Sequence, residues 1–384
     1  MRLVRCWLRA VALPLFLLAA PLLAASPQTL HVERATPPRD LKPLPMFIGG
    51  RTLAEDDAAN AAFGAKQYVY QWPGTYFAVA FRGPEVFFRI GSGREILHVV
   101  ADGQPPVVLT TPEPGVYRVS GLGGGDHALR LEVVTESQSA PDSFDGFALA
   151  ASATPLPPPV RPHQIEFIGD SYTVGYGNTS PTRECSRDQV WSTTDTAQAF
   201  GPLVAAREDA EDQINAISGH GVVRNYDGSP GDPVPVAYPY VLFDRKNVYR
   251  DASWHPQLIV IGLGTNDFST PLHPGEPWKT RAALHADYEA TYVRFLRMLR
   301  ARNPQAYLLL WATDGANGEI QTEVQKVVAQ YKASGDSRIA FLPVNGLGMT
   351  ACDWHLSTAD DRTVAGMIDD FLHRHPEILA AGPR

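Results

Sequence analysis

The segment 154–162 divides this 384-residue chain into two parts with different sequence patterns. Five of its nine residues are proline, which predicts a stiff, extended linker. Short apolar runs separated by turn residues precede the segment, whereas apolar runs that alternate with helical patterns follow it. Because this chain is longer than most domains that fold around one hydrophobic core, we expect a separate domain on each side of the segment.

The part from 46 to 153 has the pattern of an all-β domain. Its apolar runs are separated by Gly, Pro or Asp turns, with no helical run between them, which favours a β-sandwich of the jelly-roll kind. Residues 26–45, rich in proline and without periodicity, are interpreted as a linker that leads into this domain. The clearest strand candidates are residues 76–81, 85–90, 96–100, 115–119 and 127–134.

The part from 163 to 384 alternates strand and helix patterns. Continuous apolar strands in such a rhythm indicate a parallel sheet with helices on both faces, which is a three-layer α/β/α domain. The predicted strands are 164–168, 213–217, 257–263, 305–311 and 338–342, and the predicted helices are 195–207, 280–302, 318–333 and 357–374.

Residues 1–25 have the three-part pattern of a secretory signal peptide. Arginines precede an apolar run from residue 10 to 23, and small residues follow, so cleavage is expected after Ala25. A membrane anchor is the alternative, but the run is short and contains Pro14 and Pro21. The chain is therefore expected to be secreted or periplasmic.

Charge and cysteine content limit the partners of the mature protein. The formal net charge is −8, and loss of the three signal-peptide arginines makes it −11, which argues against nucleic acid as a partner and fits a neutral substrate. No later stretch is apolar and long enough to predict membrane insertion after signal removal. In an exported chain, Cys185 and Cys352 are expected to form a disulfide.

Four short segments at predicted strand ends carry the candidate functional residues. Ser171 lies in a Gly-Asp-Ser turn, Gly219 and Asn266 follow two later strands, and His355 lies in the loop before the last helix. Because the carboxyl ends of parallel strands meet at one edge of a sheet, we expect these four residues to converge there.

The four segments together resemble the SGNH hydrolase superfamily, whose name-giving residues correspond to these four positions. The fuller motifs in 165–178, 218–226 and 352–355 resemble carbohydrate esterase family 2. That resemblance implies a flavodoxin-like parallel sheet behind a jelly-roll domain. It also implies removal of acetyl groups from plant cell-wall polysaccharides such as xylan and glucomannan, through a serine acetyl-enzyme.

Acyl-transfer chemistry gives each residue a role. Ser171 would be the nucleophile and His355 the base that accepts its proton. The backbone N–H groups of Ser171 and Gly219 and the side-chain amide of Asn266 would form the oxyanion hole, with Gly221 as the alternative to Gly219.

Two possibilities remain for the group that orients His355. The superfamily usually places an acid three residues before the histidine, whereas Asp353 is two residues before it. In an extended segment its carboxylate would reach Nδ1, and we expect this arrangement. The alternative is a backbone carbonyl in the same loop, with that of Trp354 the nearest candidate.

The aromatic residues near these motifs are candidates for sugar binding. Trp354, Tyr172 and Tyr176 could each present a flat face to a sugar ring, and packing inside the domain is the alternative for the tyrosines. No spacing of ligands predicts a metal site, and no glycine motif predicts a dinucleotide, so no cofactor is expected. A lipid or thioester hydrolase, or an inactive sugar-binding protein, are the alternative functions.

Overall fold

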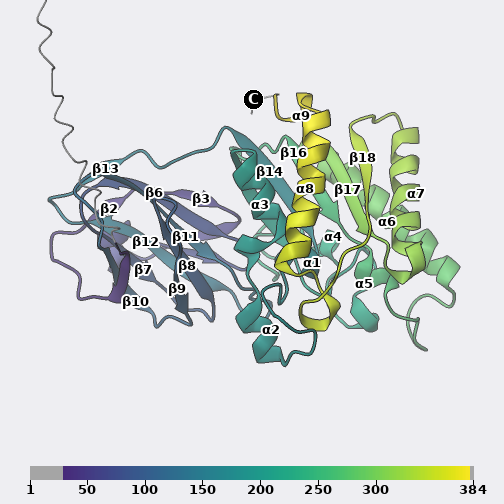
Figure 1. Cartoon of the computed structure of the whole chain (residues 1–384), viewed down its shortest axis with the longest axis horizontal. Coiled ribbons are helices and arrows are strands. Elements are labelled where there is room, and N and C mark those ends of the chain that lie inside the picture. The colour runs from purple at the N-terminus through teal and green to yellow at the C-terminus, as the bar shows by residue number, and fades with distance from the viewer. Residues whose placement is uncertain (1–28, 381–384) are drawn as a thin grey trace, which may run out of the picture.

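The computed structural model describes residues 29–380, in which two domains lie side by side (Figure 1). The predicted signal peptide falls in the first 28 residues and lies outside the described part. No helix within residues 29–380 has the length and apolar character needed to cross a membrane.

The first domain is a sandwich of two antiparallel sheets, as predicted. Phe77 of one sheet and Phe144 of the other pack with ring centroids 4.3 Å apart in the shared core. One sheet has the order β1 (His31–Arg34), β10 (Gly115–Ser120), β7 (Val86–Ile90), β12 (Asp142–Leu149), β5 (Lys66–Tyr70) and β4 (Thr52–Asp56), with β2 (Lys42–Leu44) beside β12. The other has the order β13 (Thr154–Leu156), β6 (Tyr76–Arg82), β11 (Asp126–Val133), β8 (Ile96–Ala101) and β9 (Val107–Thr110), with β3 (Phe47–Gly49) beside β6.

Both predicted linkers are partly wrong, because each contributes strands to the sandwich. Residues 26–45 supply β1 and β2, and residues 154–162 supply β13, in which Pro155 pairs with Phe81 of β6. Strand β13 lies at the edge of its sheet, where a proline without an N–H is tolerated.

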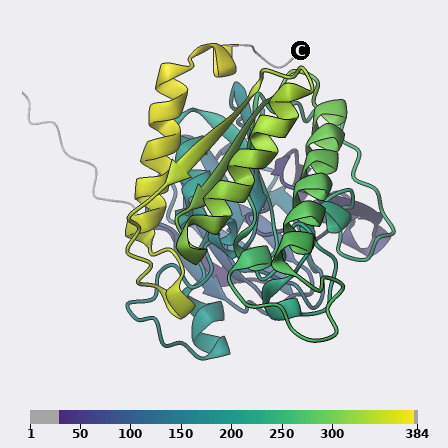
Figure 2. The ribbon, with the colours of Figure 1, turned by 90° about the vertical axis from the view of Figure 1, so that its right-hand side faces the viewer.

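The second domain contains the predicted parallel sheet, with helices on both faces (Figure 2). Its strand order, second-first-third-fourth-fifth in sequence, is the flavodoxin-like order. The strands in spatial order are β15 (Ala210–Ala216), β14 (His163–Gly169), β16 (Leu258–Gly262), β17 (Tyr307–Thr313) and β18 (Ile339–Val344). The long helices are α3 (Phe200–Arg207), α6 (Arg281–Arg302), α7 (Glu319–Ala333) and α8 (Thr358–Arg374).

The predicted elements agree with these bounds to within a few residues, with one exception. The helix expected over 195–207 begins only at Phe200. Asp195 instead caps a separate 3-10 turn, η2 (Thr196–Gln198), because its carboxylate accepts from Ala197 N at 3.1 Å. The remaining short helical segments are η1 (Ala58–Phe63), α1 (Ser171–Val174), α2 (Arg187–Thr193), η3 (Tyr226–Gly228), α4 (Val234–Ala237), α5 (Thr265–Phe268), η4 (Ala316–Gly318), η5 (Cys352–Trp354) and α9 (Glu377–Ala380).

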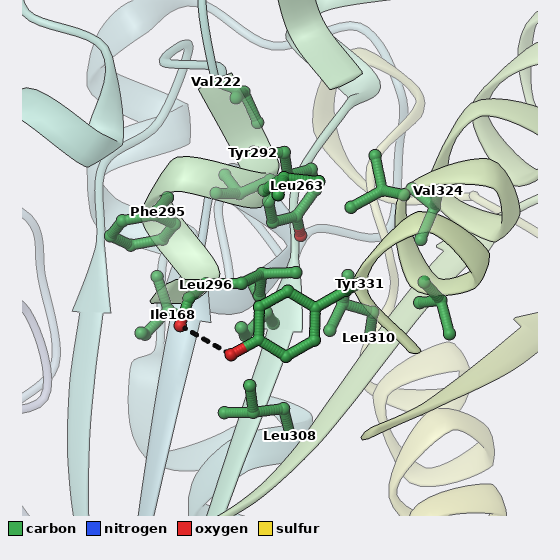
Figure 3. Close-up of a cluster of buried hydrophobic side chains, with 14 of the residues drawn as sticks. Ile168, Val222, Leu263, Tyr292, Phe295, Leu296, Leu308, Leu310, Val324 and Tyr331 are labelled. Carbon is green, nitrogen blue, oxygen red and sulfur yellow. Dashed lines mark hydrogen bonds between the residues drawn. The ribbon is translucent and has the colours of Figure 1, made fainter. Parts of the chain in front are cut away.

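Alternation along the central strands creates one apolar core on each face of the sheet. Leu308 and Leu310 face α6 and α7, whereas Leu309 between them faces α3 and α8. Figure 3 shows the first core, in which the Tyr331 hydroxyl donates to the Leu296 carbonyl at 3.5 Å. Helix α6 buries one apolar stripe in this core: Leu284, Tyr288, Tyr292, Phe295, Leu296 and Leu299.

A buried ion pair joins the two domains. Arg51 of the sandwich lies 3.2 Å from Glu166 on β14, and both side chains are at most 1% exposed. The same Glu166 oxygen accepts from Asn215 Nδ2 at 2.6 Å and from the Tyr238 hydroxyl at 2.7 Å. Because a buried carboxylate is tolerated only when it is paired, strand β14 depends on a cation from the other domain.

We expect Arg51→Met to lower the free energy of unfolding by about 3–5 kcal/mol, because Glu166 would remain buried without its cation. The matched control is Arg82→Met, whose partner Asp126 and own side chain are both more than half exposed, with a much smaller expected loss because water screens the exposed pair. Urea unfolding measures both variants. Equal losses would contradict the importance of the buried pair.

Candidate active site

The four predicted segments do converge at the carboxyl edge of the parallel sheet. Ser171 follows β14, Gly219 follows β15, Asn266 lies in α5 after β16, and His355 lies between β18 and α8. Helices α1, α2 and α5 mark this edge on the lower side of the second domain in Figure 1.

Ser171 opens the short helix α1. Asp170 caps that helix by accepting from Tyr172 N at 3.1 Å, and Gly175, with φ at +80°, ends it in the left-handed conformation. The Ser171 hydroxyl lies 2.8 Å from His355 Nε2. The predicted nucleophile and the predicted base are therefore within hydrogen-bond distance, although 184 residues separate them in the sequence.

Backbone carbonyls fix the tautomer of His355. Its Nδ1 lies 2.9 Å from the carbonyl oxygen of Cys352 and 3.1 Å from that of Asp353. Since carbonyl oxygens only accept, Nδ1 carries the proton and Nε2 is free to accept the proton of Ser171.

The expected contact between the Asp353 carboxylate and His355 is therefore wrong. No hydrogen bond in the described chain joins these two groups, and the carboxylate instead accepts from the Tyr176 hydroxyl at 3.1 Å. The prediction assumed an extended segment, but Asp353 and Trp354 have φ values of +52° and +62°. This left-handed turn directs backbone carbonyls toward Nδ1; they belong to Cys352 and Asp353, not to Trp354 as the alternative named.

The surroundings of His355 favour its neutral form. Burial lowers the pKa of the imidazole from its ordinary value of 6.5, and the two carbonyls offset only part of this effect. The ring packs between Tyr176, at a centroid distance of 4.3 Å, and Tyr172, at 5.4 Å. An imidazole that stays neutral at neutral pH can act as a general base.

The three aromatic candidates lie in different environments. Tyr172 and Tyr176 are partly buried and pack against the imidazole of His355, so neither presents a fully open ring face to a sugar. Trp354 is 64% exposed, and the guanidinium of Arg183 lies 3.6 Å from its ring centre. One face of the indole is thus stacked on a cation, which leaves the other face for a ligand.

The predicted disulfide between Cys185 and Cys352 is confirmed, with the Cα atoms 5.4 Å apart. Arg183, two residues before Cys185, donates to the carbonyls of Met349 and Gly348 at 2.8 and 2.9 Å. The segment before α2 therefore holds the histidine loop by a covalent bond and by side-chain hydrogen bonds.

Two backbone amides are available for an oxyanion. None of the hydrogen bonds among residues 29–380 uses the N–H of Ser171 or of Gly219. The alternative Gly221 is a poorer candidate, because its N–H donates to Asn225 Oδ1 at 3.3 Å. A Cβ at Gly221 would lie 2.2 Å from the Arg224 carbonyl, so this glycine serves the turn.

Asn266 is placed between the nucleophile turn and the Gly219 loop. Its Nδ2 donates to Asp170 Oδ2 at 3.1 Å and to the His220 carbonyl at 3.0 Å. These two partners match the two N–H bonds of the amide, so Asn266 would have to exchange one of them to donate to an oxyanion.

Sequence reasoning missed the residues that hold the Gly219 loop in place. The buried Asp267 carboxylate accepts from the backbone N–H groups of Val222, Val223 and Arg224, each at 2.9 Å for the shortest contact. Burial raises the pKa of Asp267 to about 6, although these hydrogen bonds act to lower it. Asp267 follows Asn266, which the motif assigns to the oxyanion hole, but no pattern in the sequence indicates which backbone groups the Asp267 carboxylate binds.

The side chain of Arg224 also ties this loop to the segment after α5. Its buried guanidinium pairs with Glu276 at 2.6 Å and donates to Thr270 Oγ1 at 2.8 Å.

Residues 29–380 contain no group of three or more His, Cys, Asp or Glu side chains arranged to hold a metal ion.

Comparison with known families agrees with both domains. The family described as "Carbohydrate esterase 2 N-terminal" matches residues 61–159, and the GDSL-like lipase/acylhydrolase family matches residues 167–377. An acetylxylan esterase/glucomannan deacetylase from Cellvibrio japonicus (strain Ueda107) is 46% identical over 359 residues, which cover 93% of this chain and 96% of that protein. The chain belongs to carbohydrate esterase family 2. It is thus a serine ester hydrolase of the GDSL type, as the motifs indicated.

Solved structures of family 2 esterases share this architecture. One, described for divergent catalytic and non-catalytic binding functions of its active site, has a TM-score of 0.83 at 45% identity, covering 88% of this chain and all of that chain. Another, from Clostridium thermocellum in complex with cellohexaose, has a TM-score of 0.74 at 26% identity, covering 87% of this chain and all of that chain.

The carbonyl contacts of His355 predict different outcomes for two substitutions. Asp353→Asn should keep aryl acetate hydrolysis within about fivefold, because asparagine tolerates the left-handed φ and its amide oxygen can still accept from Tyr176. His355→Ala should lose at least about a thousandfold in kcat/KM, because no base remains.

Steady-state kinetics on p-nitrophenyl acetate, with circular dichroism as a control for folding, measures both variants. A loss in Asp353→Asn as large as that in His355→Ala would show that the carboxylate, not the carbonyls, supports the base.

Proposed function

We propose that this family 2 esterase removes O-acetyl groups from plant cell-wall polysaccharides such as xylan and glucomannan, through an acetyl-enzyme on Ser171. The observation that carries the proposal is the 2.8 Å contact between the Ser171 hydroxyl and the unprotonated nitrogen of His355. The Cellvibrio japonicus relative, named as an acetylxylan esterase and glucomannan deacetylase, supports the substrate class.

In the first half-reaction, Ser171 Oγ attacks the acetyl carbonyl while its proton moves to His355 Nε2. The negative charge that develops on the carbonyl oxygen is stabilised by the N–H groups of Ser171 and Gly219, and by Asn266 once it releases one of its present acceptors. The sugar oxygen then leaves with the proton from Nε2, and the acetyl group remains on Ser171.

In the second half-reaction, water attacks the acetyl ester of Ser171 and gives its proton to His355 Nε2. The same N–H groups stabilise the second oxyanion. The Ser171 oxygen leaves with the proton from His355, and acetate is released. The carbonyls of Cys352 and Asp353 keep Nδ1 protonated throughout, so Nε2 remains the nitrogen that exchanges protons.

The charge and the surface near the site support a neutral, extended substrate. The excess of acidic residues disfavours anionic partners. Residues 223–233 and 273–278 border an open cleft of about 520 Å³, which provides room for sugar units beyond the acetylated one. The exposed face of Trp354 offers a further surface for a sugar ring.

A short acyl group is favoured over a long one. The Cellvibrio japonicus relative is named for the removal of acetyl groups, which argues against the lipid hydrolase alternative. The free amides and the paired Ser171 and His355 argue against a protein that only binds sugars.

The proposed location is outside the cytoplasm, by secretion or in the periplasm. A disulfide such as Cys185–Cys352 persists in oxidising compartments, and the substrate class is extracellular.

Ser171→Ala tests the nucleophile. The variant should fold normally and lose at least about ten-thousandfold in kcat on aryl acetates and on acetylated xylan, because only binding and oxyanion stabilisation remain. Acetate release measures the activity. The wild type should prefer acetyl over butyryl esters, and a preference for butyryl or longer chains would favour the lipid hydrolase alternative.

Trp354→Ala tests the sugar platform. Because the indole is exposed and does not contact the base, kcat/KM should fall about tenfold or more on acetylated glucomannan but less than threefold on p-nitrophenyl acetate. Equal losses on both substrates would instead assign Trp354 a structural role in the histidine loop.

A further inference from the structure

A loop of the sandwich domain reaches the residue that precedes Gly219. Residues 134–141 connect β11 to β12, and two of their side chains bind the backbone of Ser218. Glu136 Oε1 accepts from Ser218 N at 2.7 Å, and Gln138 Nε2 donates to the Ser218 carbonyl at 2.9 Å. Both backbone groups of Ser218 are therefore held by the domain that lacks the nucleophile.

The Ser218 carbonyl is special because its peptide plane also contains the Gly219 N–H. A trans peptide is planar, and its C=O and N–H point in opposite directions. A donor that fixes the Ser218 carbonyl therefore fixes the direction of the Gly219 N–H. That N–H has no acceptor among residues 29–380.

The side chain of Gln138 is itself held in place. Its Nε2 lies 3.0 Å from Glu136 Oε1, and its backbone carbonyl accepts from Gln71 Nε2 at 3.2 Å. Gln71 also bridges to the second domain, since its Oε1 accepts from Phe243 N at 3.0 Å. A donor side chain that is already fixed loses less conformational entropy on forming a hydrogen bond than a mobile donor side chain does.

Contacts on both sides of Ser218 and Gly219 leave this peptide plane few other orientations. On one side, Trp72 of the sandwich packs on Ile217, and both are at most 2% exposed. On the other side, the Gly219 carbonyl accepts from Tyr226 N at 2.8 Å. Gly219 itself has φ at +82°, a conformation that glycine adopts without strain.

We propose that Gln138, supported by Glu136, is a positioning residue that aims the Gly219 N–H at the oxyanion formed on Ser171. The sandwich domain then contributes to catalysis without contacting the substrate. The proposal rests on the ester chemistry of the proposed function, and it does not depend on which polysaccharide carries the ester.

Gln138→Ala should lower kcat on p-nitrophenyl acetate about tenfold with KM within twofold, because a misaligned donor loses part of the hundred- to thousandfold effect of an oxyanion-hole hydrogen bond. Gln138→Glu, which is isosteric but cannot donate, should lose at least as much. Glu136→Gln keeps an acceptor for Ser218 N and should retain most of the activity.

Two further measurements separate positioning from general damage. Methylboronic acid adds to a serine hydroxyl and places a negatively charged oxygen in the oxyanion hole, so its inhibition constant should rise by a similar factor in Gln138→Ala. The matched control is Gln330→Glu on α7, an exposed glutamine whose amide also donates to a carboxylate, and its kcat should be unchanged.

An unchanged kcat in Gln138→Ala would overturn the proposal, and so would a rise in KM alone, which would indicate substrate contact. A fall in kcat with unaltered boronic acid binding would also overturn it. A wild type that cleaves the aryl acetate but no acetylated polysaccharide would refute the proposed substrate and leave this test valid.

Discussion

The buried carboxylate of Glu166 is the point on which the arrangement of the two domains depends. One of its oxygens accepts from Arg51 of the sandwich, from Asn215 on β15 and from Tyr238 after α4. Strands β14 and β15, which lead to Ser171 and Gly219, thus share a charged atom with the other domain. Arg130 of the sandwich adds a second ion pair, to Asp212 on β15 at 3.3 Å. Because an unpaired charge there would be strongly unfavourable, the site can reach its geometry only when the sandwich is docked.

Sequence patterns identified the two domains and the long strands and helices within them, because hydrophobic periodicity is a local property. The continuous apolar run in 305–311 and the helical pattern in 280–302 follow from strand and helix geometry, and both elements are found within two residues of these bounds. The linkers were mispredicted because strand pairing is not local. Pro155 can lie in β13 only because that strand is at a sheet edge, and no pattern within 154–162 contains this information.

Local patterns were also insufficient to predict the whole candidate site. Ser171, Gly219, Asn266 and His355 could be located because each follows a strand, and the sheet brings strand ends together. The partner of His355 could not, because it depends on two left-handed residues whose φ values are not encoded in their identity.

Contacts between distant residues left no sequence signal at all. Glu136 and Ser218 are 82 residues apart, and Asp267 and Val222 are 45 apart. Neither contact creates a periodicity or a motif, so only the folded chain reveals that these carboxylates hold the backbone around Gly219.

The use of carbonyls instead of a carboxylate for His355 is consistent with the charges already present. Asp170 and Asp267 are both buried beside the nucleophile, and burial raises the pKa of Asp170 to about 7, with the nearby charge of Asp267 adding to the shift. A third carboxylate at Nδ1 would stabilise the imidazolium, but it would also repel the oxyanion that forms on the Ser171 ester. Carbonyl dipoles fix the same tautomer without adding a net charge. In the proposed mechanism, the contact of the Asp353 carboxylate with Tyr176 leaves Nδ1 of His355 to the backbone carbonyls, so no carboxylate is hydrogen-bonded to the base.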